Sequence, residues 1–415
     1  MPLFVWQYNQ PCMNIFTNKH ILLGITGSIA AYKAADLASK LTQAGAQVDV
    51  ILTPAAEKFI TPLTFQSVTG RKAFTDAELW GGEAHVLHVG LGHSADLLAI
   101  APCTANTLAK LAHGLADNLL TITALAAHCP LLIAPAMDVG IYTNVATQDN
   151  LRVLGERGVY FAGPDEGHMA SGLVGKGRFV EPAELLGHIR LVLGRNGPLA
   201  GKKIVVTAGG TQEPLDPVRV LTNKSSGKQG FALAQAALDA GGTVVLVTAT
   251  TALTPPVGAK VVQVTTAQQM LEAVLAESAG AEALIMAAAV ADFRPKQVAE
   301  DKLKKRDGIP QIELEAAPDV LAAVAGMGSR KPQRIIGFAA ESRYLLENAR
   351  FKLKSKKLDM IVANDISAPD SGFGAETNHV ILLFPDKKEE PLPLMSKAEV
   401  AETIIARLAV LLDNK

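Results

Sequence analysis

Short apolar segments alternate with helical patterns twice along the chain. In the first half, HILLGIT, AQVDVILT, DLLAIA and PLLIA are separated by stretches with helical periodicity, such as residues 30–44. Continuous apolar strands that alternate with helices are typical of parallel βα units. The pattern restarts at KKIVVTAGG, with helices expected over 227–240, 266–278 and 397–412 and strands at TVVLVTA, ALIMAAA, RIIGFAA, LDMIVAN and HVILLF. The sequence therefore predicts an α/β protein with two doubly wound, Rossmann-like domains in tandem.

The segment LGRNGPLAGKK, at 193–203, separates the two halves. It is rich in Gly, Pro and Lys, which is typical of a linker between domains. We expect one domain at 19–193, a linker at 194–201 and a second domain at 202–415. Residues 1–18 carry no charged side chain and are interpreted as an N-terminal extension, with Met13 as an alternative start.

Charge and apolar content exclude several classes of protein. Lys and Arg number 39 against 40 Asp and Glu, so the basic surface of a nucleic-acid-binding protein is not expected. The longest apolar run, ALIMAAAVA, is far shorter than the roughly 20 residues that span a bilayer, and no basic n-region of a secretory signal is present. Three cysteines without CxxC spacing argue against a disulfide framework. We expect a cytoplasmic protein without nucleic-acid or membrane partners.

The segment GITGSIAAYKAADLA follows a strand and opens a helix. Gly27 permits close backbone approach, Ser28 supplies a hydroxyl, and free N–H groups at a helix N-terminus attract an anion. Because the segment is not GxGxxG, a mononucleotide phosphate is a better candidate than a dinucleotide. A glycine-rich turn with Ser28 as the N-cap explains the same residues.

Three further first-half segments carry candidate functional residues. HVLHVGLGH contains His85, His88 and His93, but their spacing is poor for a metal site. We interpret them as loop histidines, with a general base as the functional alternative. Asp138 in APAMDVGIYTN is placed to cap a helix. GHMASGLVGKGRF, with Lys176 and Arg178, is either a mobile flap over a phosphorylated substrate or a flexible loop.

In the second half, TAGGTQEPLDPVRVLTNKSSGKQG joins a strand to a helix through an unusually long polar connection. Ser225, Ser226 and Gly227 stand where a helix N-terminus begins, so they are candidates to cradle phosphates. Structureless loops of this length are uncommon unless they are functional, which favours a binding role. The charged run EDKLKKRDG is by itself typical of a solvated loop.

Taken together, these segments resemble the bifunctional phosphopantothenoylcysteine decarboxylase/phosphopantothenate–cysteine ligases of coenzyme A biosynthesis. The resemblance covers residues 19–413. The first-half motifs are shared with other flavin-dependent cysteine decarboxylases and with flavin prenyltransferases. The combination of GGTQEPLDPVR and TNKSSGKQG with AAAVADFRP, KLKK, APDVLA and GFAAES is much more specific.

The resemblance implies that the first domain is a flavodoxin-like decarboxylase that uses FMN to oxidise the cysteinyl thiol, which creates the electron sink that decarboxylation needs. The implied flavin-binding positions are Gly27, Ser28, Thr53, Thr104 and Asn106. His88 matches the catalytic histidine of the family. Two positions depart from the family pattern: Asp138 stands where many relatives have Asn in PAMN, and Ser171 stands where many have the proton-donating Cys of ACG. A serine is a far weaker acid than a thiol, which puts the final protonation in doubt.

For the second domain, the resemblance implies a CTP-dependent ligase that joins 4′-phosphopantothenate to cysteine through an acyl-cytidylate. Asn223 is assigned to the handling of this intermediate and Lys302 to its formation. The implied CTP-binding positions are Asp292, Lys302, Pro318, Asp319, Val320, Phe338, Lys352 and Lys356. Mg²⁺ is expected with the triphosphate. The resemblance also implies a homo-oligomer of trimeric decarboxylase units joined by ligase dimers. A flavin prenyltransferase, a peptidyl-cysteine decarboxylase-like enzyme and a non-catalytic flavoprotein regulator stay open as alternatives.

Overall fold

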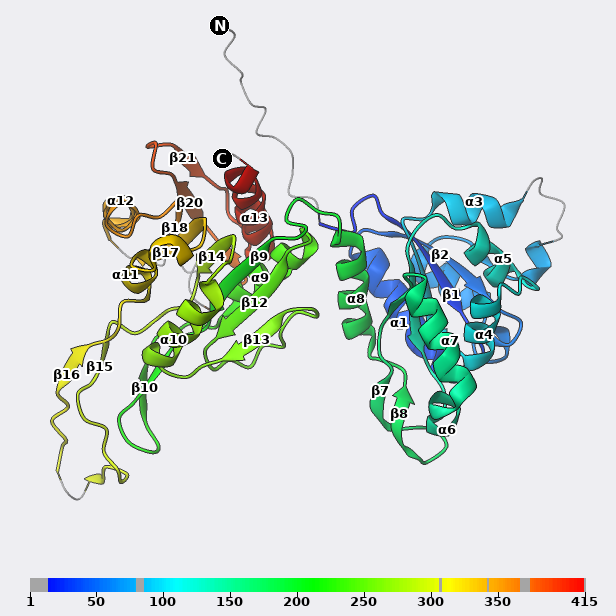
Figure 1. Cartoon of the computed structure of the whole chain (residues 1–415), viewed down its shortest axis with the longest axis horizontal. Helices are drawn as coiled ribbons and strands as arrows, with labels where there is room; N and C mark the ends of the chain where they lie inside the picture. The colour runs from blue at the N-terminus through cyan, green and yellow to red at the C-terminus, as the bar shows by residue number, and fades with distance from the viewer. Residues whose placement is uncertain (1–13, 80–85, 306–307, 342, 366–373, 414–415) are drawn as a thin grey trace, which may run out of the picture. The chain divides into compact units, whose positions relative to one another are not determined.

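The computed structural model describes residues 14–79, 86–305, 308–341, 343–365 and 374–413. The chain divides into two compact units, Met1–Gly194 and Arg195–Lys415 (Figure 1). Each unit contains a mainly parallel sheet with helices on both faces. The predicted fold class, two tandem doubly wound α/β domains, is therefore confirmed.

The sheet of the first unit has the order β3–β2–β1–β4–β5–β6, and all neighbouring strands are parallel. The order reverses between β1 and β4, so the loops that leave these two strands diverge and open a crevice at their carboxyl ends. The strands are β1 (His20–Ile25), β2 (Gln47–Leu52), β3 (Ala73–Phe74), β4 (Leu97–Cys103), β5 (Leu131–Pro135) and β6 (Tyr160–Phe161).

Helices cover both faces of this sheet because its strands are apolar on both sides. In β1, Leu23 packs into the core of one face and Leu22 into the core of the other. Phe16, in the described part of the expected N-terminal extension, is fully buried in the first of these cores. The first core includes α1 (Ala31–Gln43), α2 (Pro62–Thr69) and α8 (Pro182–Gly194); the second includes α3 (Leu87–Ser94), α4 (Ala105–His113), α5 (Leu119–Ala126) and α7 (Val145–Glu156).

The sheet of the second unit has the order β13–β12–β9–β14–β17–β18–β20–β21. Its first six strands are parallel, and β20 and β21 extend the sheet in antiparallel fashion. Here the strand order reverses between β9 and β14. The strands are β9 (Lys203–Ala208), β12 (Thr243–Thr248), β13 (Lys260–Gln263), β14 (Ala283–Met286), β17 (Arg334–Glu341), β18 (Met360–Asp365), β20 (Val380–Leu383) and β21 (Glu389–Pro391).

The helices of the second unit follow the same two-faced arrangement. One core joins the sheet to three helices, and on the other side α9 packs against α13. The three helices are α10 (Ala267–Ser278), α11 (Val320–Ala325) and α12 (Leu345–Ser355), and the pair on the other side is α9 (Lys228–Asp239) and α13 (Lys397–Asp413).

Small antiparallel ribbons occupy segments that the sequence pattern presented as loops. GHMASGLVGKGRF contributes to β7 (Asp165–His168) and β8 (Val174–Arg178), and the long polar connection after β9 contains β10 (Gln212–Pro214) and β11 (Val220–Thr222). The run EDKLKKRDG lies in the connection between β15 (Phe293–Pro295) and β16 (Leu314–Ala316), and residues 306–307 of that run lie outside the described residues. A further pair joins β19 (Thr377–Asn378) to β22 (Met395–Ser396).

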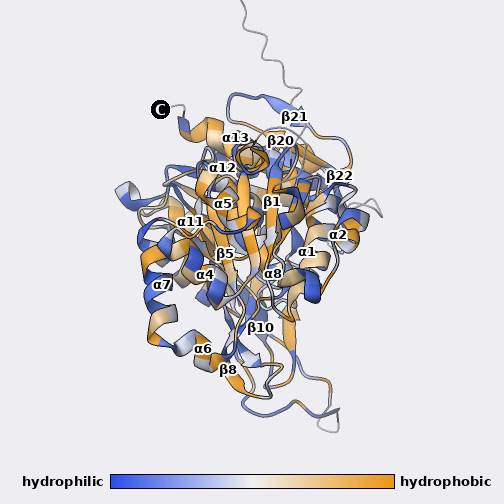
Figure 2. Ribbon diagram, turned by 90° about the vertical axis from the view of Figure 1, so that its right-hand side faces the viewer, coloured by the Kyte–Doolittle hydropathy of each residue, from blue (hydrophilic) through white to orange (hydrophobic). Residues whose placement is uncertain are grey.

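Hydropathy follows this layering. The strands near the labels β1 and β5 are orange in Figure 2, as expected for strands that helices cover on both faces. Within the described residues, every helix is too short or too polar to cross a bilayer.

Candidate functional site

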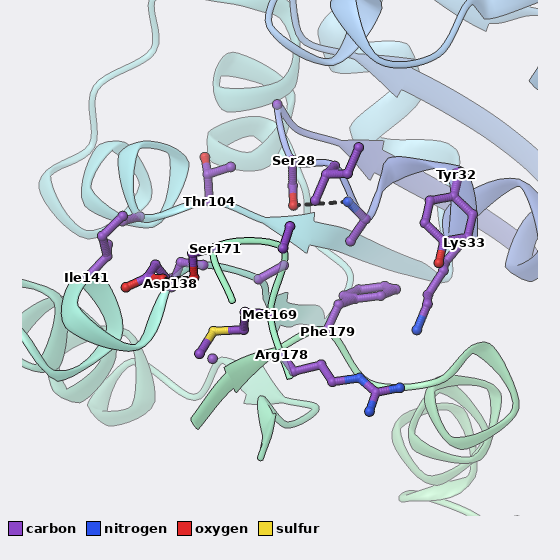
Figure 3. A pocket seen from close by; sticks show the side chains of 18 of the residues that line it. Ser28, Tyr32, Lys33, Thr104, Asp138, Ile141, Met169, Ser171, Arg178 and Phe179 are labelled. Atoms are coloured by element: carbon purple, nitrogen blue, oxygen red, sulfur yellow. Dashed lines mark hydrogen bonds between the residues drawn. The ribbon is translucent and has the colours of Figure 1, made fainter. Parts of the chain in front are cut away.

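A cavity of about 830 Å³ opens at the carboxyl end of the first sheet, where the strand order reverses. Its walls come from the loops after β1, β4 and β5 and from the β7–β8 ribbon (Figure 3). A hydrogen bond from Thr26 Oγ1 to Pro102 O (2.7 Å) and one from the Thr104 N–H to Thr26 Oγ1 (3.0 Å) join the first two loops. The cavity thus lies at the position where doubly wound sheets bind ligands.

The loop after β1 closely approaches its neighbour. A Cβ atom on Gly27 would lie 2.5 Å from the Cβ of Ala55, so no other residue fits without displacing the backbone. Ser28 Oγ accepts a hydrogen bond from the Ala30 N–H (3.3 Å), whereas Ala30 is the N-cap of α1. The interpretation of Ser28 as the N-cap is therefore wrong. Gly27 and Ser28 instead form the wall of the cavity next to the start of α1.

Four of the five predicted flavin-binding positions line this cavity together: Gly27, Ser28, Thr104 and Asn106. Thr104 is also the N-cap of α4, because its hydroxyl accepts from the Thr107 N–H (3.4 Å). Thr53 is not among the described lining residues. Its buried hydroxyl donates to Ile25 O (3.3 Å) and accepts from the Ala56 N–H (3.3 Å), which fixes the turn that follows β2.

Asp138 and Ser171 line another part of the cavity and contact each other. Ser171 Oγ donates to Asp138 Oδ2 at 2.5 Å, and the Gly140 N–H donates to Asp138 Oδ1 at 3.0 Å. Asp138 is thereby the N-cap of α6 (Val139–Thr143), the default role that the sequence suggested. The hydrogen bond from Ser171, and then the one from Gly140, hold the pKa of the Asp138 carboxyl below its ordinary value. The two departures from the family pattern therefore form one polar pair.

The β7–β8 ribbon carries Ser171 in its connecting turn and is held against the loop after β5. The Met137 N–H donates to Gly177 O (3.0 Å), and Lys176 Nζ lies 5.7 Å from the ring centre of Tyr142 on α6. These contacts place Ser171 beside Asp138, although 33 positions separate them in the chain. The segment is thus a docked ribbon in this structure.

Lys33 and Arg178 also line the cavity, and the sequence interpretation did not assign a site role to Lys33. One feature of the sequence could have indicated a role for Lys33. Lys33 lies in the first turn of α1, where the partial positive charge of the helix end disfavours a cation.

His88 is absent from the described residues that line this cavity. It lies on α3, and the expected loop over the histidine segment is wrong, because residues 87–94 form a helix. His88 lines a second cavity of about 370 Å³, with Val86 and Asp117 among its neighbours. His93 stacks on His128 with ring centres 4.4 Å apart, and His85 lies outside the described residues. No three His, Cys, Asp or Glu side chains of the described chain are grouped to hold a metal ion.

In the second unit, the loops after β9 and β14 meet where the strand order reverses. Gly210 forms a bridge with Ala289, and Asn223 Nδ2 donates to Ala289 O and Val290 O, each at 3.3 Å. Asn223 follows β11 and precedes Gly227, whose φ of 79° allows the chain to turn into α9. The amide of Asn223 is thus held at the carboxyl end of the sheet.

Asp216 connects two motifs that are far apart in the sequence. Its fully buried carboxylate accepts from the N–H groups of Val218 (2.8 Å), Arg219 (2.8 Å) and Leu303 (3.1 Å). Burial alone would raise the pKa of Asp216, but these donors hold it below its ordinary value. Arg219 completes the connection with a hydrogen bond to Leu303 O (3.0 Å). The segment that carries the exposed Lys302 is therefore fixed to the loop after β9.

The remaining predicted CTP-binding residues form a connected group. The Ala317 N–H donates to Asp292 O (2.9 Å), which brings Asp292 next to Pro318. Asp319 is the N-cap of α11 and forms an ion pair with Lys356. Burial would raise the pKa of Asp319, but Lys356 and the Ala322 N–H hold it low.

Lys352 Nζ donates to Phe338 O (2.8 Å) at the carboxyl half of β17. Val320 begins α11 and is buried in the core beneath these groups. The structure thus gathers Lys352 and Lys356 near the start of α11, and these two lysines can supply positive charge to the phosphates of a nucleotide.

Comparison with known proteins covers both units. The flavoprotein family model matches residues 14–193, and the model of the DNA/pantothenate metabolism flavoprotein C-terminal domain matches 199–411. The coenzyme A biosynthesis bifunctional protein CoaBC of Bacillus subtilis (strain 168) is 44% identical over 400 residues, 96% of this chain and 98% of that protein. The CoaBC protein of Vibrio vulnificus (strain YJ016) is 42% identical over 404 residues, 97% and 100% of the two chains. A crystal structure of a CoaBC C-terminal domain is 40% identical, covers 53% of this chain and 100% of its own, and gives a TM-score of 0.46.

Proposed function

Since this chain belongs to the family of coenzyme A biosynthesis bifunctional proteins, we propose that it is an enzyme for two consecutive steps of that pathway. The first step joins 4′-phosphopantothenate to cysteine at the expense of CTP. The second decarboxylates the resulting 4′-phosphopantothenoylcysteine to 4′-phosphopantetheine. Similarity over nearly the whole chain, with a separate family match for each unit, favours this function over a flavin prenyltransferase, a lone cysteine decarboxylase or a flavoprotein regulator.

The observation that carries the decarboxylase assignment is the cavity at the reversal of the first sheet. Its volume of about 830 Å³ suits a cofactor together with part of a substrate. The close approach at Gly27 and the first turn of α1 provide the backbone cradle that a flavin phosphate needs, so the residues present fit FMN. When bound, FMN supplies the two-electron oxidation of the substrate thiol, which provides the electron sink for loss of carbon dioxide.

Within this site, we assign Asp138 and Ser171 to the cysteinyl end of the substrate. The hydroxyl proton of Ser171 points to Asp138, so the oxygen of Ser171 presents lone pairs to the cavity rather than an acidic hydrogen. Ser171 therefore orients the substrate, and the proton for the final reduction comes from another group. Asp138 fixes the start of α6 and holds Ser171 in place.

In the ligase unit, we assign Lys302 to the formation of the acyl-cytidylate and Asn223 to its attack by cysteine. A lysine beside the triphosphate offsets the charge that develops as pyrophosphate leaves. The group around Asp319, Lys352 and Lys356 is assigned to the nucleotide. Mg²⁺ usually binds through one or two carboxylates and substrate phosphates, so the exposed Asp292 in this region suffices as a protein ligand for Mg²⁺ with CTP.

We also propose a cytoplasmic homo-oligomer of trimeric decarboxylase units joined by ligase dimers. The surface around α3 and α5 exposes apolar side chains, with Val86 57% and Leu125 59% accessible. This exposure supports an interface with another copy of the chain at that surface. His88 lies in this region and away from the cavity, so a catalytic role for it requires a neighbouring copy of the chain. The molar mass of the assembly by light scattering tests this proposal, and a monomer contradicts it.

The flavin assignment is tested on the purified full chain. We expect a yellow protein from which denaturation releases FMN, identified by absorbance and mass. Gly27→Val should lose the pigment, because a side chain at that position collides with Ala55. Gly45→Val is the control. A valine at the φ of 97° found at Gly45 strains the backbone, but Gly45 is not part of the cavity wall, so the folded variant should retain the pigment. A folded but colourless wild-type protein without FMN affinity contradicts the assignment.

A further inference from the structure

The charges on the wall of the first-unit cavity are separated. Among its described lining residues, those with a formal charge at neutral pH are Lys33, Asp138 and Arg178. In Figure 3, Asp138 and Ser171 lie on the left of the cavity, and Lys33 and Arg178 lie on the right. A ligand that extends across the cavity thus meets a carboxylate at one end and two cations at the other.

A single carboxylate oxygen brings the two cations together. Glu181 Oε1 accepts from Lys33 Nζ at 2.7 Å and from Arg178 Nη2 at 2.6 Å. The hydrogen bond from Lys33 is the main reason why the pKa of Glu181 lies below its ordinary value. Two positive charges share one negative charge, so the group keeps a net positive charge beside the cavity.

The three side chains differ in exposure, and that of Arg178 is 42% exposed at the rim of the cavity. Only 16% of the Lys33 side chain is exposed, against 49% for Glu181. The lysine is therefore held in the wall, while the carboxylate lies toward solvent. Lys33 also stands in the first turn of α1, which has no acidic residue to offset it. An anion bound beside the Lys33 ammonium would offset its charge, whereas the backbone N–H groups at the start of α1 are assigned to the flavin phosphate.

The position of Arg178 is fixed by its neighbours in the chain. Gly177 O accepts from the Met137 N–H (3.0 Å), and Phe179 is only 4% exposed. On the paired strand β7, a Cβ atom on Gly167 would lie 3.1 Å from both Cδ and Nη1 of Arg178, so the absence of a side chain leaves room for the guanidinium. Its N–H donors other than the one used by Glu181 suit the oxygens of a phosphate.

We propose that Lys33 and Arg178 form the subsite for the phosphate monoester of the decarboxylase substrate, with Glu181 holding the two cations ready. This inference rests on the proposed function, which supplies a substrate with a cysteinyl group at one end and a phosphate at the other. The cysteinyl end then lies toward Asp138 and Ser171. The phosphate of FMN has the same chemistry and is assigned above to the loop of Gly27 and Ser28 in the same cavity, so the test below separates the two phosphates.

The test compares 4′-phosphopantothenoylcysteine with dephosphorylated pantothenoylcysteine on the full-length flavoprotein. The variants are Lys33→Met, Arg178→Met and the double variant. Lys40→Met is the matched control, because Lys40 lies on the same helix, pairs with Asp36 and is outside the cavity wall. The readouts are carbon dioxide release with each substrate, and fluorescence titration of the apoprotein with FMN and with riboflavin.

We expect wild type and Lys40→Met to prefer the phosphorylated substrate. Each single variant should lower that preference about tenfold through KM, as expected for loss of one charged hydrogen bond, and the double variant should lower it further. Turnover of the dephosphorylated substrate and the affinity for FMN should stay within about twofold of wild type, which also shows that the variants fold.

Two results overturn the subsite. An unchanged substrate preference in the double variant means that the ion pairs only fasten β8 to α1. A loss of FMN affinity with unchanged riboflavin affinity means that the pair binds the flavin phosphate. If wild type releases no carbon dioxide from either substrate, the proposed function itself fails, which is a different outcome from active variants with unchanged preference.

Discussion

Ser171 Oγ donates a 2.5 Å hydrogen bond to Asp138 Oδ2, which joins the turn of the β7–β8 ribbon to the N-cap residue of α6. The family resemblance implies a thiol and an amide at these two positions. Here a hydroxyl faces a carboxylate, and the pKa of that carboxyl is lowered by the serine. The proton of Ser171 is thus committed to Asp138 and is poorly placed for transfer to a substrate.

The first prediction concerns Ser171→Ala. Because the serine proton is already committed, we expect complete conversion to 4′-phosphopantetheine at a rate within about tenfold of wild type. Mass spectrometry of the products measures it. Accumulation of an oxidised aminoenethiol in the variant, with no reduced product, would show that the serine hydroxyl itself is the donor.

The second prediction separates the two half-reactions of the ligase. Asn223→Ala should still release pyrophosphate from CTP and accumulate the acyl-cytidylate, whereas Lys302→Ala should fail before that intermediate forms. Loss of an oriented polar contact of this kind costs roughly 3–4 kcal/mol in the affected step, or about 10²–10³ in rate. Quenched-flow detection with radiolabelled CTP, with and without cysteine, measures both steps. Equal accumulation in both variants, or none in either, contradicts the two assignments.

The third prediction tests Asp216 as a positioning residue for Lys302. Asp216→Asn replaces a carboxylate that accepts three backbone N–H groups by an amide that cannot accept at both ends. We expect acyl-cytidylate formation to fall about tenfold through a higher KM for CTP, with decarboxylation of added 4′-phosphopantothenoylcysteine unchanged. Asp301→Asn, at an exposed position beside Lys302, is the matched control and should behave as wild type. An unchanged KM for CTP in Asp216→Asn would refute the positioning role.

The fourth prediction concerns the pH dependence of stability at the amino ends of β1 and β2. His20 Nε2 lies 2.7 Å from Asp49 Oδ2 and its Nδ1 lies 3.0 Å from Ser94 O, so both ring nitrogens face acceptors and favour the imidazolium. The hydrogen bond to Asp49 is the main reason why the pKa of His20 is raised above 6.5.

Arg71 also pairs with Asp49, through Nε at 2.7 Å. Burial by itself would raise the pKa of Asp49, but His20 and Arg71 lower it to about 2. The histidine contribution to stability is therefore complete below the ordinary pKa of His and disappears as pH rises through the raised value. The Asp49 contribution is present above 3.8 and disappears as pH falls toward 2.

We expect His20→Asn to destabilise the first unit at pH 6 and to approach wild type at pH 9. Asp49→Asn should cost on the order of 2 kcal/mol at pH 6, since it leaves the largely buried His20 and the partly exposed Arg71 without their common partner. The free energy of unfolding of the full chain, monitored through the release of flavin, measures both effects. The exposed His113→Asn is the control. A His20→Asn deficit that grows between pH 6 and pH 9 would refute the charged pair.

Much of the fold was predictable because parallel strands that are buried on both faces give continuous apolar segments, and such segments indicate strands in the interior of a sheet. The helix expected at 266–278 is α10, Ala267–Ser278, where Thr266 and Gln269 form a capping box. The histidine segment was misassigned for a physical reason. Two glycines within it weaken the helical signal, and α3 is stabilised by tertiary packing rather than by local propensity: Leu91 is buried in the core and Gly92 lies against the backbone of Thr123 and Ala127.

The site was predictable only where a motif is local. Gly27 and Ser28, or Thr104 and Asn106, are near neighbours in sequence and also share the cavity wall. The contact of Ser171 with Asp138 depends on how a ribbon folds back over α6, and the hydrogen bond from the Leu303 N–H to Asp216 joins two motifs. Such contacts arise from tertiary packing, which residue periodicity does not encode.

The most direct test of the central proposal is one incubation of the full chain with 4′-phosphopantothenate, cysteine, CTP and Mg²⁺. We expect pyrophosphate, carbon dioxide and 4′-phosphopantetheine in equal amounts, with no carbon dioxide when CTP is omitted. Added 4′-phosphopantothenoylcysteine should restore carbon dioxide release without CTP. A flavin-containing, folded protein that consumes CTP but releases no carbon dioxide from either starting material, or that consumes neither, would contradict the assignment of two linked activities to this chain.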